Sequence, residues 1–319
     1  MNYRKTLQFL IGIALTVLLL YLAFTKVDIS VVIERLRQTK LEYVLLGICT
    51  FLISYLIRAR LWKELLRPSV DVPIIHLFKA VVIGQMGNNI LPFRGGEILR
   101  IYSIKKTSLV NVPLALSSIT LERVLDLISL IVLIGFLSIW IDLPDLLRKS
   151  ILIIVFCTIL LFFIMIFLAQ VKSSKKYFNW LVNISPKNQK YLIDKTINNL
   201  IQGVASLKNP IMIFGIIFIS LGCWIFAYIS VVFSLKAYHI ETGWIMPLFV
   251  LVVLNIGMMV PLLPASLGAY QFFSILALEH FGIDRSIALG FSFVIQSIDL
   301  IASVGFGLIF FYTGRLNFS

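Results

Sequence analysis

The sequence has few of the residues that catalytic sites and disulfide-rich domains use. Charged residues make up only 13% of the 319 positions, and there are three histidines and three cysteines. Cys49, Cys157 and Cys223 all lie inside apolar runs, so they provide neither a secreted-type disulfide framework nor a metal-binding spacing. We therefore expect no metal site.

The motifs of catalytic sites are also missing. The sequence contains no Ser/His/Asp set, no HExxH motif, no nucleotide-binding loop and no Asp-rich metal motif. Segment 171–209, the longest polar loop, holds seven lysines and one aspartate and is too short for a catalytic domain. We expect neither an enzyme nor a bound cofactor. Without an ATP site, any transport would run downhill or be coupled to an ion.

Apolar residues are abundant instead. They make up 60% of the chain, which has a mean hydropathy of +0.99, whereas a soluble domain stays near half apolar. Several apolar runs approach or exceed the roughly 18–20 residues that span a bilayer. Segment 7–24 resembles a signal sequence but lacks a small-residue cleavage site, so we interpret it as a first span. The sequence predicts an all-α, polytopic membrane protein.

We expect one integral membrane domain, 1–319, with about six full spans and two broken or re-entrant segments. Its approximate halves, 1–170 and 210–319, are joined by loop 171–209. The full spans are expected near 7–25, 43–57, 112–140, 151–169, 210–235 and 286–313. Segment 26–42 suits a short amphipathic helix on the membrane surface. Segment 58–63 is typical of a basic and aromatic anchor at the membrane interface.

The net charge of +13 lies in loops between spans, where it sets orientation and does not indicate a nucleic-acid partner. The basic segments 1–5, 58–79, 94–106 and 171–209 are expected in the cytoplasm, and the weakly charged segments 26–42, 141–150 and 236–243 outside. These assignments of loops to the two sides of the membrane are consistent only if one broken segment enters the membrane from the cytoplasm and the other enters it from outside. We expect a multi-pass plasma-membrane protein with both termini in the cytoplasm.

The first broken segment is 84–100, a polar stretch between apolar ones. Asn88 and Asn89 can cap or reverse a helix, Pro92 removes a backbone donor, and Gly95-Gly96 permits a break. One interpretation is a broken helix that carries Arg94, Glu97 and Arg100 into a protein-lined cavity. The other is a short cytoplasmic loop.

The second broken segment, 244–281, contains Pro261, Pro264 and Gly268. Both segments place Leu-Pro ahead of glycine and then a polar side chain. Broken helices in an inverted-topology repeat are a recurring transporter plan. Chance is the alternative, because Leu-Pro and Gly are common near helix ends.

Charged residues also lie where a membrane makes them costly. Glu122 falls about 15 Å into the helix expected to begin near Val112, and it shares a face with Asp126. Arg123 can pair with Asp126, and Asp299 lies midway along the last span. Such charges usually face a partner or a wet cavity. A functional site, internal ion pairs that only fix packing, or a shifted helix would each account for them.

At this point the residues resemble a family. The pattern consists of Arg60-Leu-Trp62, the run from Gly84 to Arg100, Glu122-Arg123-x-x-Asp126, and Pro261-x-x-Pro264 with Gly268. It is similar, over essentially the whole chain, to the flippase-like membrane region of lysylphosphatidylglycerol synthases, which also has stand-alone members. The resemblance implies a lipid translocator without synthase activity. The chain departs from the family at Ala265-Ser266 and at Gln271, where glycines and an acid are expected.

We expect the site to bind a lipid headgroup and to comprise Asn88, Asn89, Arg94, Glu97, Arg100, Glu122, Arg123, Asp126, Gln271 and Asp299. Its arginines would hold a phosphate, and its acids would hold an amine or orient the arginines. The expected partner is a phospholipid, an aminoacyl lipid or a polyprenyl-phosphate lipid, and the chain can form a homo-oligomer. The alternatives are a small-anion transporter and a membrane-embedded accessory subunit or enzyme of lipid or glycolipid biosynthesis.

Overall fold

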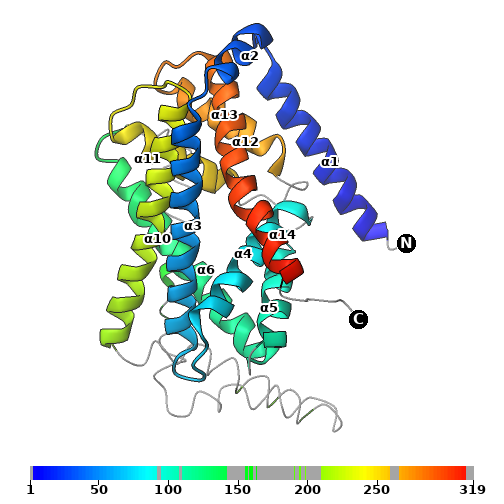
Figure 1. Cartoon of the computed structure of the whole chain (residues 1–319), viewed down its shortest axis with the longest axis vertical. Coiled ribbons are helices and arrows are strands. Elements are labelled where there is room, and N and C mark those ends of the chain that lie inside the picture. The colour runs from blue at the N-terminus through cyan, green and yellow to red at the C-terminus, as the bar shows by residue number, and fades with distance from the viewer. Residues whose placement is uncertain are drawn as a thin grey trace. The chain divides into compact units, whose positions relative to one another are not determined.

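The structure is a computed structural model, and it describes residues 3–91, 95–107, 110–141, 155–156, 158–160, 163, 190, 194, 198, 210–258 and 266–313. Within those residues all regular structure is helical, as predicted (Figure 1). The helices are α1 (Tyr3–Phe24), α2 (Ile29–Arg37), α3 (Leu41–Leu66), α4 (Ile74–Ile90), α5 (Gly96–Thr107), α6 (Val112–Leu137), α10 (Pro210–Ala237), α11 (Ile245–Gly257), α12 (Ala269–Glu279), α13 (Arg285–Leu300), the π-helical turn η4 (Ile301–Gly305) and α14 (Phe306–Thr313).

Three stretches in the described part of the chain are long and apolar enough to cross a membrane: Leu41–Leu66, Ile211–Ala237 and Arg285–Thr313. A fourth is possible if Gly12–Phe24 and Ile29–Arg37, which meet at a bend of 85°, form one span. Helix α6 is 26 residues long but is not among them, because three charged residues lie near its middle. The chain is a helical membrane protein, and six full spans remain a prediction.

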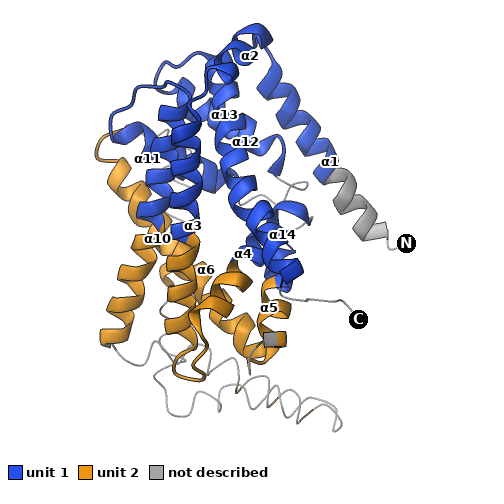
Figure 2. Cartoon of the chain, in the orientation of Figure 1, with its two compact units in different colours: residues 1–54, 82–99, 224–319 blue, residues 55–81, 100–223 orange. Residues whose placement is uncertain are grey.

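The chain divides into two compact units (Figure 2). Unit 1 comprises 1–54, 82–99 and 224–319, and unit 2 comprises 55–81 and 100–223. Both units take residues from each of the two halves expected from the sequence, and helices α3, α4, α5 and α10 contribute to both. A single domain made of two sequential halves stays a prediction.

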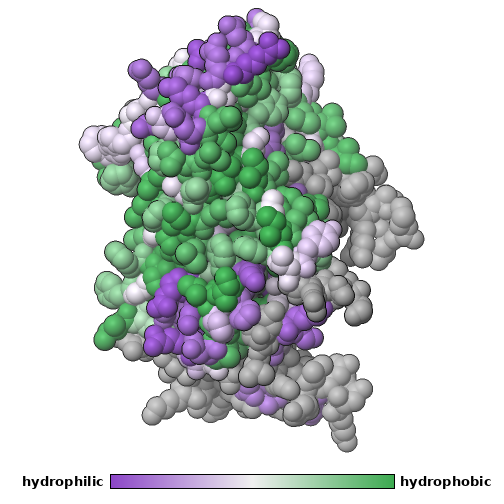
Figure 3. Space-filling view, in the orientation of Figure 1, coloured by the Kyte–Doolittle hydropathy of each residue, from purple (hydrophilic) through white to green (hydrophobic). Residues whose placement is uncertain are grey.

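In unit 1, helix α12 packs against α1, α11 and α13, and α13 also packs against α2. Helix α2 is amphipathic, and its N-cap Asp28 accepts hydrogen bonds from the backbone N–H and hydroxyl of Ser30 at 2.9 and 2.6 Å. Hydrophilic side chains gather over α2, and hydrophobic ones cover the neighbouring surface of unit 1 (Figure 3). A short amphipathic helix after the first span was predicted, and the structure has one there.

The first predicted helix break is confirmed: α4 ends at Ile90 and α5 begins at Gly96. The two helices meet so closely that a Cβ built on Gly96 would lie 1.9 Å from the backbone oxygen of Gly84. A Cβ on Gly87 would lie 2.6 Å from the Cα of Gly96. Glycine at these positions therefore permits the backbone contact that folds α5 back along α4.

The second break lies between α11 and α12, and Gly268 is the last residue before α12. Gly268 has a φ of +84°, a backbone conformation that favours glycine. Its N–H donates to the side-chain oxygen of Gln271 at 2.9 Å, which closes the first turn of α12. Gly268 therefore has the break-forming role predicted for it. Pro92, Pro261 and Pro264 lie outside the described residues.

Candidate functional site

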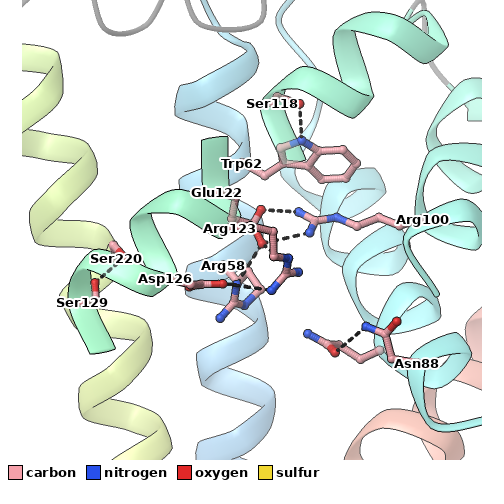
Figure 4. A network of polar contacts seen from close by, with 11 residues as sticks. Arg58, Trp62, Asn88, Arg100, Ser118, Glu122, Arg123, Asp126, Ser129 and Ser220 are labelled. Atoms are coloured by element: carbon pink, nitrogen blue, oxygen red, sulfur yellow. Dashed lines mark hydrogen bonds and ion pairs between the residues drawn. The ribbon is translucent and has the colours of Figure 1, made fainter. Parts of the chain in front are cut away.

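Five charged side chains of unit 2 form one cluster, here called the arginine–carboxylate cluster (Figure 4). Arg100 binds Glu122 through two nitrogens, at 2.9 and 2.7 Å. Arg58 contacts the same carboxylate at 2.9 Å and also Asp126 at 2.8 Å. Arg123 contacts Asp126 at 2.9 Å. The two carboxylates are thus shared among three guanidinium groups.

Three helices supply these residues. Asn111 begins α6 by accepting a hydrogen bond from the N–H of Leu114 at 2.9 Å, and Pro113 occupies the first turn, as predicted. With the helix start set there, Glu122 and Asp126 share one face near the middle of α6. Arg58 comes from α3, and Arg100 comes from α5. The cluster therefore forms near the middle of α6, where the sequence placed Glu122, and its depth in a membrane stays a prediction.

Sequence reasoning missed Arg58. Segment 58–63 was expected to anchor α3 at the membrane interface, and that prediction is wrong for Arg58 and Trp62. Helix α3 continues to Leu66, about 12 Å beyond Arg58. Arg58 faces the two carboxylates, and Trp62 is fully buried. The spacing of the two residues, one helical turn apart, was a usable signal, since it places both on one face of α3.

Trp62 fixes the geometry of Arg100. The indole N–H of Trp62 donates to the hydroxyl of Ser118 on α6 at 2.9 Å. The guanidinium carbon of Arg100 lies 4.0 Å from the centre of the indole ring, a cation–π distance. The stacked ring covers one face of the guanidinium while Glu122 occupies its edge. Arg100 is therefore held in one orientation by contacts from α3 and α6.

Exposure divides the cluster into two groups. The side chains of Arg100 and Glu122 are 2% and 0% exposed, whereas that of Arg123 is 38% exposed. Three guanidinium groups face two carboxylates, so these five residues carry one positive charge in excess. Arg123 is thus the member of the cluster that an external anion can reach most readily.

A second group of polar side chains lies inside unit 1 and is here called the Asp299 group; it consists of Asn89, Tyr270, Asp299 and Ser303. Asp299 accepts hydrogen bonds from the hydroxyl of Tyr270 at 3.0 Å and from the amide of Asn89 at 3.3 Å. The same amide donates to Ser303 at 2.9 Å. Gln271 donates to Gln296 at 2.7 Å. The sequence predicted that Asn89, Gln271 and Asp299 have functional roles, but it did not single out Tyr270 or Ser303.

A π-helical turn follows Asp299. Residues Ile301–Gly305 form η4, and the hydroxyl of Ser303 donates to the carbonyl oxygen of Asp299 at 2.7 Å. Such turns place an extra residue in a helix and occur often at functional sites. Ser303, inside this turn, contacts both the amide of Asn89 and the backbone of Asp299.

The remaining predicted site residues, not among the members named above for the two groups, are Asn88, Glu97 and Arg94. The side-chain oxygen of Asn88 accepts from the N–H of Gly96 at 3.1 Å, so Asn88 caps α5, a role that was expected for an asparagine here. Glu97 lies in the first turn of α5, within unit 1. Arg94 lies outside the described residues. Because the arginine–carboxylate cluster and the Asp299 group belong to different units, one site that joins them stays a prediction.

Comparison with known proteins places this arrangement in a family. Residues 9–307 match the family described as the lysylphosphatidylglycerol synthase TM region. The chain belongs to this family. The resemblance drawn from the sequence motifs is therefore confirmed, and the match covers nearly the whole chain.

The chain is also similar to individual proteins. A UPF0104 membrane protein of Methanothermobacter thermautotrophicus is 23% identical over 90% of this chain and 89% of its own length. The UPF0104 membrane protein MJ1078 of Methanocaldococcus jannaschii is 26% identical over 72% of this chain and 94% of its own length. Glycosyltransferase AglD of Haloferax volcanii is 31% identical over 39% of this chain, a match that covers 20% of that relative.

Proposed function

We propose that the protein translocates a lipid with a phosphate-bearing polar headgroup across the plasma membrane. The observation that carries the proposal is the arginine–carboxylate cluster in helices α3, α5 and α6. Charges at membrane depth are costly and generally serve a pathway or a partner. An excess of one positive charge and a partly exposed Arg123 suit a ligand that brings one negative charge.

In this proposal some residues of the cluster position the site and another binds the phosphate. Arg100, Glu122 and Arg58 hold one another and position the site, because Glu122 is fully buried and contacts both arginines. Arg123 binds the phosphate, for which a guanidinium offers two parallel N–H donors. Asp126 orients Arg123 from 2.9 Å. The acyl chains stay in the surrounding lipid, so only the headgroup needs a polar path.

Family membership supports a membrane role in lipid or glycolipid biosynthesis. We infer that the protein is not itself an enzyme, because the sequence supplies no catalytic motif. The second candidate is an accessory subunit or a membrane-embedded enzyme of glycolipid assembly. The partial similarity to a relative named as a glycosyltransferase is what favours it.

Purified protein in liposomes distinguishes these candidates. Fluorescent phosphatidylglycerol, phosphatidylcholine, an aminoacyl phosphatidylglycerol and a polyprenyl-phosphate lipid are each incorporated, and quenching from outside reports their transfer between leaflets. Translocation of at least one phosphate-bearing lipid, faster than in protein-free liposomes, is the expected result. Turnover of a lipid without translocation would favour the enzyme, and passage of a small anion alone would favour an anion transporter.

We propose a topology with six full spans, cytoplasmic termini and both broken segments re-entrant. It is supported by two interrupted helix pairs, α4 with α5 and α11 with α12, which is the arrangement expected of an inverted repeat. Cysteine labelling on a cysteine-free background tests it. Asn188→Cys should react only after the cells are opened, and labelling of position 188 from outside intact cells would contradict the topology.

A further inference from the structure

Unit 2 contains a groove that the arginine–carboxylate cluster does not use. Its volume is about 640 Å³, within the range of small-molecule sites. The C-terminal end of α3 forms one wall and the N-terminal end of α10 forms the other. The lining includes Arg60, Glu64 and Arg67 on the first side and Gly215, Ile216 and Ile219 on the second.

The groove exists because α3 and α10 diverge toward their ends. At Gly222 the helices touch, since a Cβ built there would lie 3.5 Å from the side chain of Ile57. Two helical turns away, a Cβ on Gly215 would meet no atom within 4 Å. Glycine at 215 therefore keeps the space between the helices open. Both helices are candidate spans, so the groove lies where two spans end.

The two walls differ in chemistry. On the α3 wall, Arg60 and Arg67 share Glu64, at 2.6 and 3.4 Å, which leaves one positive charge in excess among these three residues. Their side chains are 50% and 65% exposed, so a ligand in the groove can reach both. The α10 wall consists of apolar side chains beside Gly215. The groove thus offers a cationic rim and an apolar floor in one continuous surface.

We propose that this groove is a binding site for an anionic phospholipid. The phosphate lies against Arg60 and Arg67, and one acyl chain follows α10 past Gly215 toward Ile219. Charge complementarity and the apolar floor both favour a lipid over a free anion, which would leave the α10 wall uncovered. Basic side chains at the ends of spans attract anionic lipids. The site is separate from the cluster proposed for transport and does not depend on it.

The test measures lipid binding to the purified full chain in detergent, by native mass spectrometry. Dioleoyl phosphatidylglycerol should bind saturably and more tightly than dioleoyl phosphatidylcholine, which has the same acyl chains. Arg60→Gln with Arg67→Gln should weaken phosphatidylglycerol binding about 25-fold, at about fivefold for each arginine. Arg37→Gln, which removes an exposed arginine of α2 that does not line the groove, is the matched control and should leave phosphatidylglycerol binding unchanged.

A second variant tests the apolar floor. Gly215→Leu fills the groove and should reduce phosphatidylglycerol binding, whereas Gly135→Leu, on another helix and also in open space, should not. In the double arginine variant the Glu64 carboxylate loses both arginine partners, so a triple variant that adds Glu64→Gln removes this carboxylate as well. The triple variant should bind phosphatidylglycerol as weakly as the double one. Circular dichroism checks that each variant is folded.

Four outcomes would overturn the proposal. The first is equal binding of the two lipids, and the second is unchanged binding in folded Arg60→Gln/Arg67→Gln protein. The third is competition by millimolar inorganic phosphate, which would indicate a site for a free anion. The fourth is a change of oligomeric state in Gly215→Leu without loss of lipid binding, which would indicate an interface between two copies of the chain.

Discussion

Glu122 and Arg100 should behave as one unit when they are mutated. Glu122 is fully buried, and its carboxylate accepts hydrogen bonds from two nitrogens of Arg100 and one of Arg58. Glu122→Met leaves Arg100 buried beside Trp62 without this carboxylate, and breaking a buried pair in this way costs about 3–5 kcal/mol. Arg100→Met should cost a similar amount. These values refer to the free energy of unfolding.

The double variant separates pairing from packing. Arg100→Met with Glu122→Met removes both charges at similar volume, while Arg58 keeps Asp126 at 2.8 Å. Replacing a buried ion pair with apolar residues is often nearly neutral, so the double variant should return to within about 2 kcal/mol of the wild type. The double-mutant cycle should therefore show strong coupling. Transport should be lost in the single and double variants alike, because Glu122 also lies 3.5 Å from Arg123 and helps to position it.

Equilibrium unfolding in mixed detergent micelles, followed by tryptophan fluorescence, gives the four free energies. Glu279→Gln is the control, because Glu279 and Arg285 form a partly exposed pair at 2.9 Å that should contribute no more than about 1 kcal/mol. Additive effects of the two single substitutions would refute the reasoning. So would a double variant that is as unstable as Glu122→Met.

Two further predictions concern unit 1. Gly96→Ala should destabilise the protein by about 3 kcal/mol, because its Cβ would meet the backbone of α4, whereas Gly12→Ala, in open space, should not; thermal unfolding of the two variants compares them. Hydrogen bonds from the hydroxyl and then the backbone of Ser30 lower the pKa of Asp28 from its ordinary value. The stability that Asp28 contributes should therefore be complete above its unfolded pKa of about 4 and be lost as the pH falls through the lower folded pKa. Asp28→Asn should remove that pH dependence of the unfolding midpoint, and an unchanged profile in this variant would contradict the assignment.

Local chemistry made several elements predictable from the sequence. The asparagine and proline at the start of α6, the glycines at both breaks and the amphipathic α2 each depend on residues close in the chain. The position of Glu122 near the middle of α6 followed from counting helical rise. These predictions needed no knowledge of how the helices pack.

Partners distant in the sequence were not predictable in the same way. Arg58 lies 64 residues before Glu122, and a basic residue near the end of an apolar run usually indicates an interface anchor. Asn89 pairs with Ser303, 214 residues away, which lies in the π-helical turn after Asp299, and the sequence pattern revealed neither the contact nor the turn. Tertiary packing decided both contacts.

The most direct test of the proposed function is Arg123→Gln. Its side chain is 38% exposed, and Asp126 keeps Arg58, so the free energy of unfolding should fall by no more than about 1 kcal/mol. Losing a charge-assisted hydrogen bond of about 1.5–3 kcal/mol should slow translocation of an anionic lipid by at least about tenfold. The measurement is the initial rate of fluorescent-lipid transfer in proteoliposomes, with Arg37→Gln as control. An unchanged rate, or a loss of folded protein in proportion to the loss of rate, would contradict a headgroup site at Arg123.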